Sequence, residues 1–552
     1  QGQQGGQNQQ MALASSPAPS APQSRSQPRL AQNLANKKKD DGKLERKHSV
    51  DAANTKAPAT AGDLAKLQKN IQADRDEETM TAVEVHFNPW TDASKDHLST
   101  FGMDVDTASY AVSRGYLTDY HQMPSADLVR VEEFVNYFDY SYPAAKDKTF
   151  AIHLEGCPNP LNATTQLLRV GIRAKTIEAE ERKAANLVFV IDESGSMQRD
   201  NRLPLVRASL HMLLEHLQPN DQVAIVVFSN TAETILPMTA VKDKKAIGDA
   251  IDKLCIAGAT AIETGVRMAY DLAAKTYDKD KINRVIVCTD GEANVGITGP
   301  DAILQTITEQ KEKGIYLSTV GFGLGDYNDR MLETLADKGN GNYSHIDSLA
   351  EARRVFVEKL TGTLQTVAKD AKIQVDFNPN EVAEYRLIGY EDRDIADRDF
   401  RNDKIDGGEV GAGQSVTVLY EIKRKAGAPG ADSQETQAIA TVQIRFKDPN
   451  TPAGAETVHE ESHALTSDHV AAGIDATSLD MRLAVAVAEF ADALRKNPDL
   501  PAGALAQAKT LANAVVAARG YDDKLKELVK LIESAEALQA AERTDATPVA
   551  VK

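Results

Sequence analysis

The stretch LVFVIDESGSM, residues 187–197, constrains the fold more than any other part of the chain. Its first five residues are apolar, which predicts a buried strand of a parallel sheet. Asp192, Ser194 and Ser196 follow on alternate positions, so a carboxylate and two hydroxyls share one tight loop at the carboxyl end of the strand. These oxygen donors suit a hard divalent cation. The alternative is an ordinary polar turn, because Ser, Asp and Gly are common turn residues.

Two later segments also place oxygen-bearing side chains at the end of a predicted strand or at the start of a predicted helix. RVIVCTDGEANVG, which begins at residue 284, predicts a second apolar strand that ends at Asp290. IAGATAIETGV, which begins at residue 256, places Thr260 at the predicted start of a helix. Because strands of an open α/β sheet end at a common crevice, we expect the three loops to form a single site.

The three loops resemble the metal-ion-dependent adhesion site of von Willebrand factor type A domains. The pattern of that family is D-x-S-x-S, then T, then D in a T-D-G turn. The resemblance implies that the hydroxyls ligate Mg²⁺, or Mn²⁺ or Ca²⁺, directly, while the carboxylates act through water. One coordination position stays open, which implies capture of an acidic side chain from a protein partner. The matching residues are Asp192, Ser194, Ser196, Thr260 and Asp290.

A wider resemblance covers roughly residues 80–540. STFGMDVDTASYAVSRGYL, VRVEEFVNYFDYSYP, GNGNYSHIDSLAEARRVFVEKL and YRLIGYEDRDIADRDF are similar to signature segments of a bacterial exported von Willebrand A family, the YfbK type. That resemblance implies a non-enzymatic protein-binding module, adhesion-like or a scaffold, in the periplasm or cell envelope. Two departures from the family pattern bear on ligand preference and metal affinity. Glu193 replaces an apolar residue, and ATAIET replaces a more glycine-rich loop.

The apolar periodicity predicts an α/β fold, with a doubly wound, mostly parallel sheet inserted in a β-rich platform. The insertion predicts that strands before residue 184 pack with strands after residue 364. The expected parts are a disordered linker (1–76), an N-terminal α+β, β-rich region (77–183), the type A domain (184–365), a β-rich region (366–465), a helical cap (466–541) and a disordered tail (542–552).

Within residues 184–365, apolar runs and helical spacing alternate. The predicted strands lie near 187–191, 222–229, 284–289 and 315–320. The predicted helices lie near 202–217, 243–254, 261–276, 300–313 and 348–365.

Composition narrows the function classes. A formal net charge of −18 argues against general affinity for nucleic acid. No stretch approaches the roughly 18 to 20 uninterrupted apolar residues of a membrane span. Because the chain begins at Gln1 rather than Met, we expect a removed signal segment, and a lipid anchor upstream is compatible with that. The three cysteines, Cys157, Cys255 and Cys288, leave at least one thiol without a partner in the chain.

HEESHALTSDH predicts a different chemistry. It matches H-E-x-x-H and carries a third histidine, His469. In a helix, His459 and His463 would hold Zn²⁺ while Glu460 served as general base of a peptidase. Against this, Thr466 stands where metzincin proteases have Gly, and the segment lies among predicted strands, where these imidazoles would lie on one exposed face. A zinc-dependent peptidase is the alternative function, and a purely structural type A domain is a third.

Overall fold

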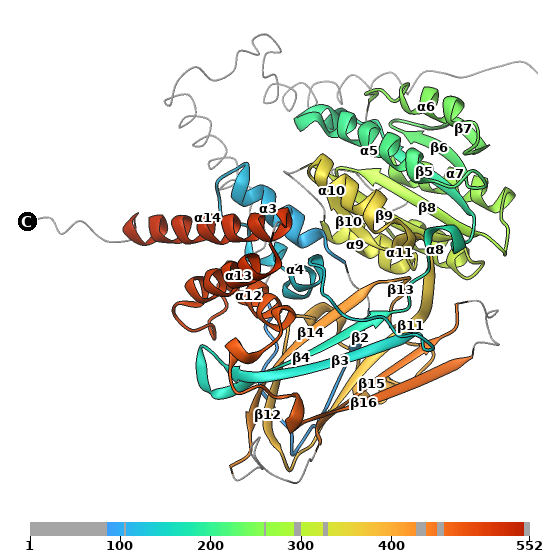
Figure 1. Ribbon diagram of the computed structural model, residues 1–552. Helices are drawn as coiled ribbons and strands as arrows, with labels where there is room; N and C mark the ends of the chain where they lie inside the picture. Colours follow the sequence, from blue (N-terminus) through green and yellow to red (C-terminus); the bar gives the residue numbers. More distant parts are fainter. Residues whose placement is uncertain are drawn as a thin grey trace, which may run out of the picture. The chain divides into compact units, whose positions relative to one another are not determined.

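The computed structural model describes residues 85–103, 106–258, 261–291, 300–323, 329–426, 438–449, 457–520 and 522–545. The linker expected over 1–76 lies outside these ranges, as do residues 546–552 of the expected tail. The described residues form an α/β domain, two β-sheets and a group of helices (Figure 1).

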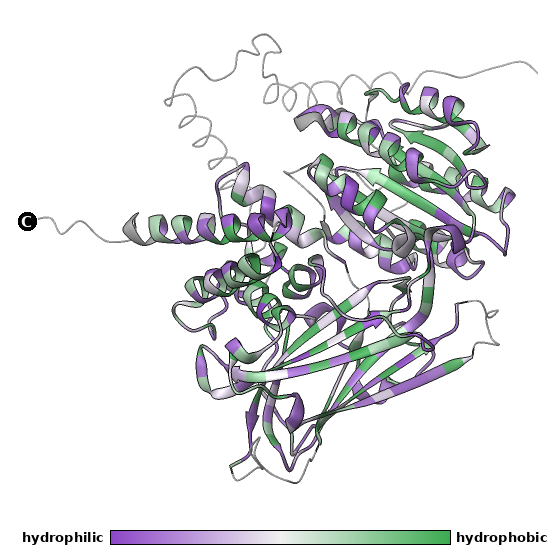
Figure 2. Cartoon of the chain, in the orientation of Figure 1, coloured by the Kyte–Doolittle hydropathy of each residue, from purple (hydrophilic) through white to green (hydrophobic). Residues whose placement is uncertain are grey.

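A six-stranded sheet forms the centre of the α/β domain, in the order β10-β9-β8-β5-β6-β7. Five strands run parallel, and β7 pairs antiparallel with β6 at one edge. The predicted doubly wound, mostly parallel sheet is therefore confirmed. All eight residues of β5 are buried, and Figure 2 shows hydrophobic residues along the central strands. The strands are β5 (Ala185–Asp192), β6 (Gln222–Phe228), β7 (Ala232–Ala240), β8 (Ile282–Thr289), β9 (Tyr316–Phe322) and β10 (Tyr343–Ile346).

Helices cover both faces of this sheet. One apolar cluster packs α5, α6 and the helical residues 352–364 against one face of the sheet. A second cluster packs α7, α8 and α9 against the other face. The helix expected over 348–365 is interrupted, because a π-helical segment, Arg354–Glu358, separates α10 from α11. The helices are α5 (Arg202–His216), α6 (Lys244–Ile251), α7 (Ile262–Lys275), α8 (Pro300–Lys311), α9 (Asp329–Lys338), α10 (Leu349–Arg353) and α11 (Leu360–Leu364).

Strands from both sides of the α/β domain share two further sheets. One sheet has the order β1-β12-β14-β4-β3, and the other joins β13-β11-β15-β16 with β2 paired to β11. The pairs β4 with β14 and β2 with β11 confirm the predicted insertion. The first sheet contains β1 (Thr91–Asp92), β3 (Phe150–Asn159), β4 (Asn162–Ala174), β12 (Val382–Ile388) and β14 (Ser415–Arg424). The second contains β2 (Leu98–Gly102), β11 (Thr366–Phe377), β13 (Val410–Gly411), β15 (Ala438–Lys447) and β16 (Val458–Thr466).

A separate apolar core joins the C-terminal helices to two helices from the N-terminal part of the chain. α14 continues to Asp545, so the tail boundary expected at residue 542 is wrong and falls inside a helix. No helix in the described ranges combines the length and apolar character that crossing a bilayer requires. The helices of this core are α3 (Ala108–Thr118), α4 (Val131–Tyr137), α12 (Leu479–Leu494), α13 (Ala504–Arg519) and α14 (Asp523–Asp545).

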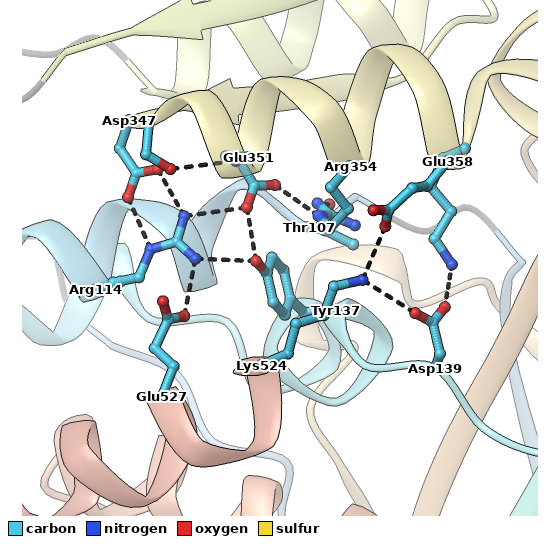
Figure 3. Close-up of polar contacts among 12 residues, drawn as sticks. Thr107, Arg114, Tyr137, Asp139, Asp347, Glu351, Arg354, Glu358, Lys524 and Glu527 are labelled. Atoms are coloured by element: carbon cyan, nitrogen blue, oxygen red, sulfur yellow. Dashed lines mark hydrogen bonds and ion pairs between the residues drawn. The ribbon is translucent and has the colours of Figure 1, made fainter. Parts of the chain in front are cut away.

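Arg114 of α3 joins the α/β domain to this helical core at a buried interface (Figure 3). Its guanidinium donates to both carboxylate oxygens of Asp347, at 2.8 and 2.6 Å, and to Oε2 of Glu351 at 3.0 Å. Its Nη1 also donates to Glu527 of α14 at 2.9 Å. The Tyr137 hydroxyl donates to the same Glu351 oxygen at 2.6 Å. We call these five residues the interface network.

A second group of charges lies beside the interface network (Figure 3). The ammonium of Lys524 on α14 lies 3.2 Å from carboxylate oxygens of both Asp139 and Glu358. Lys359 also pairs with Asp139. Glu358 and Lys359, near the end of the α/β domain, are therefore joined by ion pairs to Lys524 of α14 and to Asp139, which follows α4.

Candidate metal centre

Asp192 ends β5, and its side chain organises the loop that follows. Oδ1 accepts a hydrogen bond from the backbone N–H of Ser194 at 2.8 Å. The hydroxyl oxygens of Ser194 and Ser196 lie 2.9 Å apart and share a hydrogen bond. Oδ2 accepts from the Thr289 hydroxyl at 2.6 Å, which ties the loop to the end of β8. A buried carboxylate and two hydroxyls thus gather at the carboxyl edge of the sheet.

The loop that carries Thr260 reaches the same edge. The N–H of Gly195 donates to the carbonyl of Gly258 at 3.0 Å. Gly258 has a φ of 78°, and a Cβ there would lie 2.6 Å from the side-chain nitrogen of Asn230, so glycine is required. Thr260 itself lies outside the described residues. The structure therefore places the start of this loop beside the serines, but not the threonine hydroxyl.

Asp290 follows β8, which pairs in parallel with β5. Asp290 is buried, and its Oδ2 accepts a hydrogen bond from Nη1 of Arg202 at 2.6 Å. Arg202 begins α5 and is also buried. A Cβ at Gly323, just after β9, would lie 2.3 Å from Nε of this arginine. The missing side chain at Gly323 therefore leaves room for the guanidinium beside Asp290.

The charge environment of Asp192 favours a bound cation. Asp192 is fully buried, and among the described residues its carboxylate receives hydrogen bonds only from Ser194 and Thr289. Burial raises the pKa of Asp192 to about 6, against the effect of these hydrogen bonds. A buried carboxylate without a basic partner is stabilised by a cation. The carboxylate and hydroxyl donors therefore fit Mg²⁺ or a similar hard ion.

Glu193, one of the two departures from the family pattern, links neighbouring loops. Its N–H donates to the carbonyl of Phe228 at 2.9 Å, and its carbonyl accepts from Ala257 at 2.6 Å. Its carboxylate Oε1 accepts the backbone N–H of Cys255 at 2.8 Å. The side chain is therefore engaged with the backbone of the segment that leads to Thr260. The departure adds a loop contact and takes no ligand away.

Sequence reasoning did not identify two residues of this site. Thr289 could have been predicted, because it stands beside Asp290 in the T-D-G turn. Arg202 could not have been predicted, since it lies on another segment and no spacing rule relates it to Asp290. Its role follows only from the way α5 starts next to the end of β8.

The histidines of the zinc-peptidase alternative lie on a strand. β16 (Val458–Thr466) pairs with β15 along its whole length, and His459 and His463 are exposed on it. Four residues of strand span about 13 Å, too far for two imidazoles to bind one ion. His469 instead accepts the N–H of Thr466 at 3.1 Å. No group of three or more His, Cys, Asp or Glu side chains in the described ranges could hold a metal. The predicted helical zinc site of this segment is therefore wrong.

Three family descriptions match the chain in succession. Residues 76–169 match "von Willebrand factor", and residues 186–361 match "von Willebrand factor type A domain". Residues 362–538 match "Uncharacterized protein YfbK, C-terminal". The middle match contains the loops of Asp192 and Asp290, and the two outer matches cover the sheets and helices on either side of it.

Individual proteins are also similar to this chain. "Uncharacterized protein sll0103" of Synechocystis sp. is 26% identical over 287 residues, which are 51% of this chain and 66% of that protein. A solved structure, "von Willebrand factor type A from Catenulispora acidiphila", covers 69% of this chain and 89% of its own at 17% identity, with a TM-score of 0.42. "Uncharacterized protein YfbK" of Escherichia coli (strain K12) is 40% identical over 471 residues, which are 81% of this chain and 80% of that protein. With that identity over most of both chains, the chain belongs to the YfbK family and carries a von Willebrand factor type A domain.

Proposed function

We propose that this protein is a non-enzymatic, divalent-metal-dependent binding module of the periplasm or cell envelope. The hydroxyls of Ser194, Ser196 and Thr260 would hold Mg²⁺, or alternatively Mn²⁺ or Ca²⁺. Asp192 and Asp290 would orient the water ligands of the ion. When bound, such an ion supplies a position that accepts a carboxylate oxygen. The partner would therefore be a protein that presents an acidic side chain.

One observation carries this proposal. The buried Asp192 carboxylate lies next to two hydroxyls and has no basic partner among the described residues. Both of its oxygens accept hydrogen bonds, but only from neutral donors, whereas a buried carboxylate is normally paired with a cation. The match to the von Willebrand factor type A domain supports a protein partner, since domains of this family typically mediate protein interactions. The extracytoplasmic location rests on the resemblance to an exported family.

The first test measures the metal directly. Isothermal titration of the full chain with Mg²⁺ and with Mn²⁺ should show one bound ion, and the Asp192→Ala variant should not bind it. Asp249→Ala is the matched control, because Asp249 lies on α6 with its side chain 55% exposed. Equal ion binding by Asp192→Ala and by the unchanged chain would contradict the metal site.

The second test concerns the partner. A pull-down from envelope extract is run with the unchanged chain, with Asp192→Ala, and with EDTA present. Capture of the same protein only by the unchanged chain, and only without EDTA, supports a metal-dependent contact. Metal binding without any such capture would mean that the ion stabilises the domain and that the proposed recognition is wrong.

A further inference from the structure

A cavity of about 230 Å³ lies between the sheet β1-β12-β14-β4-β3 and the helical core, and it shares no lining residue with the metal centre. Residues of β4, β12 and β14 form one wall, and α12 with the segment after it forms the other. Trp90, just before β1, also lines it. Eight of the fifteen lining residues are apolar: Trp90, Leu161, Leu167, Leu419, Val485, Ala488, Leu500 and Pro501.

The cations at the cavity lie against Trp90. The Arg386 guanidinium lies 5.2 Å from the centre of the indole ring, and the Lys423 ammonium lies 4.1 Å from it. Arg386 donates to Asp499 at 2.9 Å and to Glu421 at 2.8 Å. Lys423 is paired with a glutamate of β12, Glu384, at 2.5 Å. Each cation of the lining therefore has an acidic partner.

Glu489 of α12 differs from these paired charges. It is 7% exposed, it lines the cavity, and its Oε2 is buried without a hydrogen-bond partner. Within the described ranges, it forms no hydrogen bond and no ion pair. Burial, with a smaller contribution from Asp492, raises the pKa of Glu489 well above its usual range. Of the five charged side chains that line the cavity, only Glu489 lacks an oppositely charged partner among the residues that the structure describes.

A buried carboxyl group without a hydrogen-bond partner lowers the stability of the fold unless a donor binds to it. We propose that the cavity binds a primary ammonium group on a short aliphatic stem, with the ammonium paired to Glu489 and the stem on the apolar walls. The inference is independent of the proposed metal-dependent function.

The dimensions of the cavity limit the ligand. Pockets for drug-sized molecules enclose roughly 300 to 1,000 Å³. The cavity, at about 230 Å³, therefore fits a short alkylamine or a single lysine side chain but not a larger ring system. Both sources present the same chemistry, an ammonium on an aliphatic stem, so the test uses one probe for each.

Trp90 supplies the readout, because it is the only tryptophan of the chain. The full chain is titrated with pentylamine, with the lysine analogue Nα-acetyl-lysine N-methylamide, and with 1-pentanol, while indole emission is recorded. We expect a saturable change with at least one amine and at least tenfold weaker binding of the alcohol, which has the same stem without the charge. A stronger response to the lysine analogue would identify a peptide side chain as the source, and a stronger response to pentylamine a free amine.

Two variants test the role of Glu489. Glu489→Gln keeps the size of the side chain and removes its charge, so amine affinity should fall at least tenfold. Glu533→Gln, on the exposed side of α14, and Asp192→Ala should leave it unchanged, which separates this inference from the metal site. Absence of a saturable response to both amines would overturn the proposal, as would equal binding of pentanol. Equal amine binding by a folded Glu489→Gln variant would do the same, and circular dichroism establishes that it is folded.

Discussion

The guanidinium of Arg202 lies 2.6 Å from Oδ2 of Asp290, and both side chains are at least 97% buried. Through this contact the start of α5 is joined to the end of β8. The pair compensates one of the two acidic side chains at the candidate metal centre, whereas Asp192 has no such partner among the described residues. Arg202 therefore contributes to the stability of the metal-free domain.

Replacing Arg202 should expose this role. Arg202→Met leaves the buried carboxylate of Asp290 without its cation, and breaking such a pair costs about 3 to 5 kcal/mol of unfolding free energy. If the site holds a metal, saturating Mg²⁺ should recover part of that loss, because the ion restores positive charge near Asp290. Urea denaturation in EDTA and in Mg²⁺ measures both quantities. Arg267→Met, at a side chain that is 53% exposed, is the control. A loss of the same size with and without Mg²⁺ would contradict the link between Arg202 and the metal.

Adding metal to the unchanged chain should raise its unfolding free energy. An ion that binds only the folded state contributes about 2.7 kcal/mol when its free concentration is a hundredfold above the dissociation constant. Ser194→Ala removes one of the two hydroxyls that lie 2.9 Å apart, so a higher Mg²⁺ concentration should be needed for the same gain. Ser229→Ala, at the end of the neighbouring strand β6, is the control for a lost hydroxyl. Thermal melts over a Mg²⁺ series give the result, and identical series for Ser194→Ala and the unchanged chain would count against a ligand role.

The interface network gives a prediction about the whole described structure. Arg114→Met leaves the largely buried Asp347 without its guanidinium and leaves Glu351 paired with Arg354 alone, which should cost about 3 to 5 kcal/mol in urea denaturation. Arg353→Met changes the same residue type on α10, where the side chain is 61% exposed, and should change stability by less than about 0.5 kcal/mol. Equal effects of the two substitutions would show that burial of Arg114 does not determine its contribution.

The central strands of the type A domain's sheet were predictable because they are mostly apolar, whereas β10, a parallel edge strand of four residues with the sequence YSHI, was missed. β5 and β8 each extend the predicted strand by two residues at its start. β7 was missed, since AETILPMTA mixes polar and apolar residues and contains Pro237. The structure shows why this sequence is compatible with a strand: β7 is an edge strand, where a proline can be placed without breaking an inner ladder.

The candidate sites were predictable only where their members are close in sequence or follow a family pattern. Asp192, Ser194 and Ser196 share one loop, so alternate spacing was enough to group them. The cavity around Glu489 could not be found in this way. Trp90 and Glu489 line the same cavity from opposite ends of the described chain. In the sequence, Glu489 reads as one more polar residue of an amphipathic helix, and its lack of a partner appears only when α12 packs on the sheet.

The three thiols should differ sharply in reactivity. All three cysteines are free: Cys255 is exposed, whereas Cys157 and Cys288 are buried. Burial raises the pKa of the Cys157 thiol to about 12 and raises that of Cys288 as well, so neither forms the nucleophilic thiolate at mildly alkaline pH. A disulfide reagent should therefore modify one thiol in the native chain and three in guanidinium chloride. Cys255→Ser should abolish the native reaction and leave two thiols in the denaturant. Cys288 lies within β8, and Cys157 lies within β3, where it pairs with Leu167 of β4. Labelling of the native variant would therefore show that β8, or the pairing of β3 with β4, opens transiently.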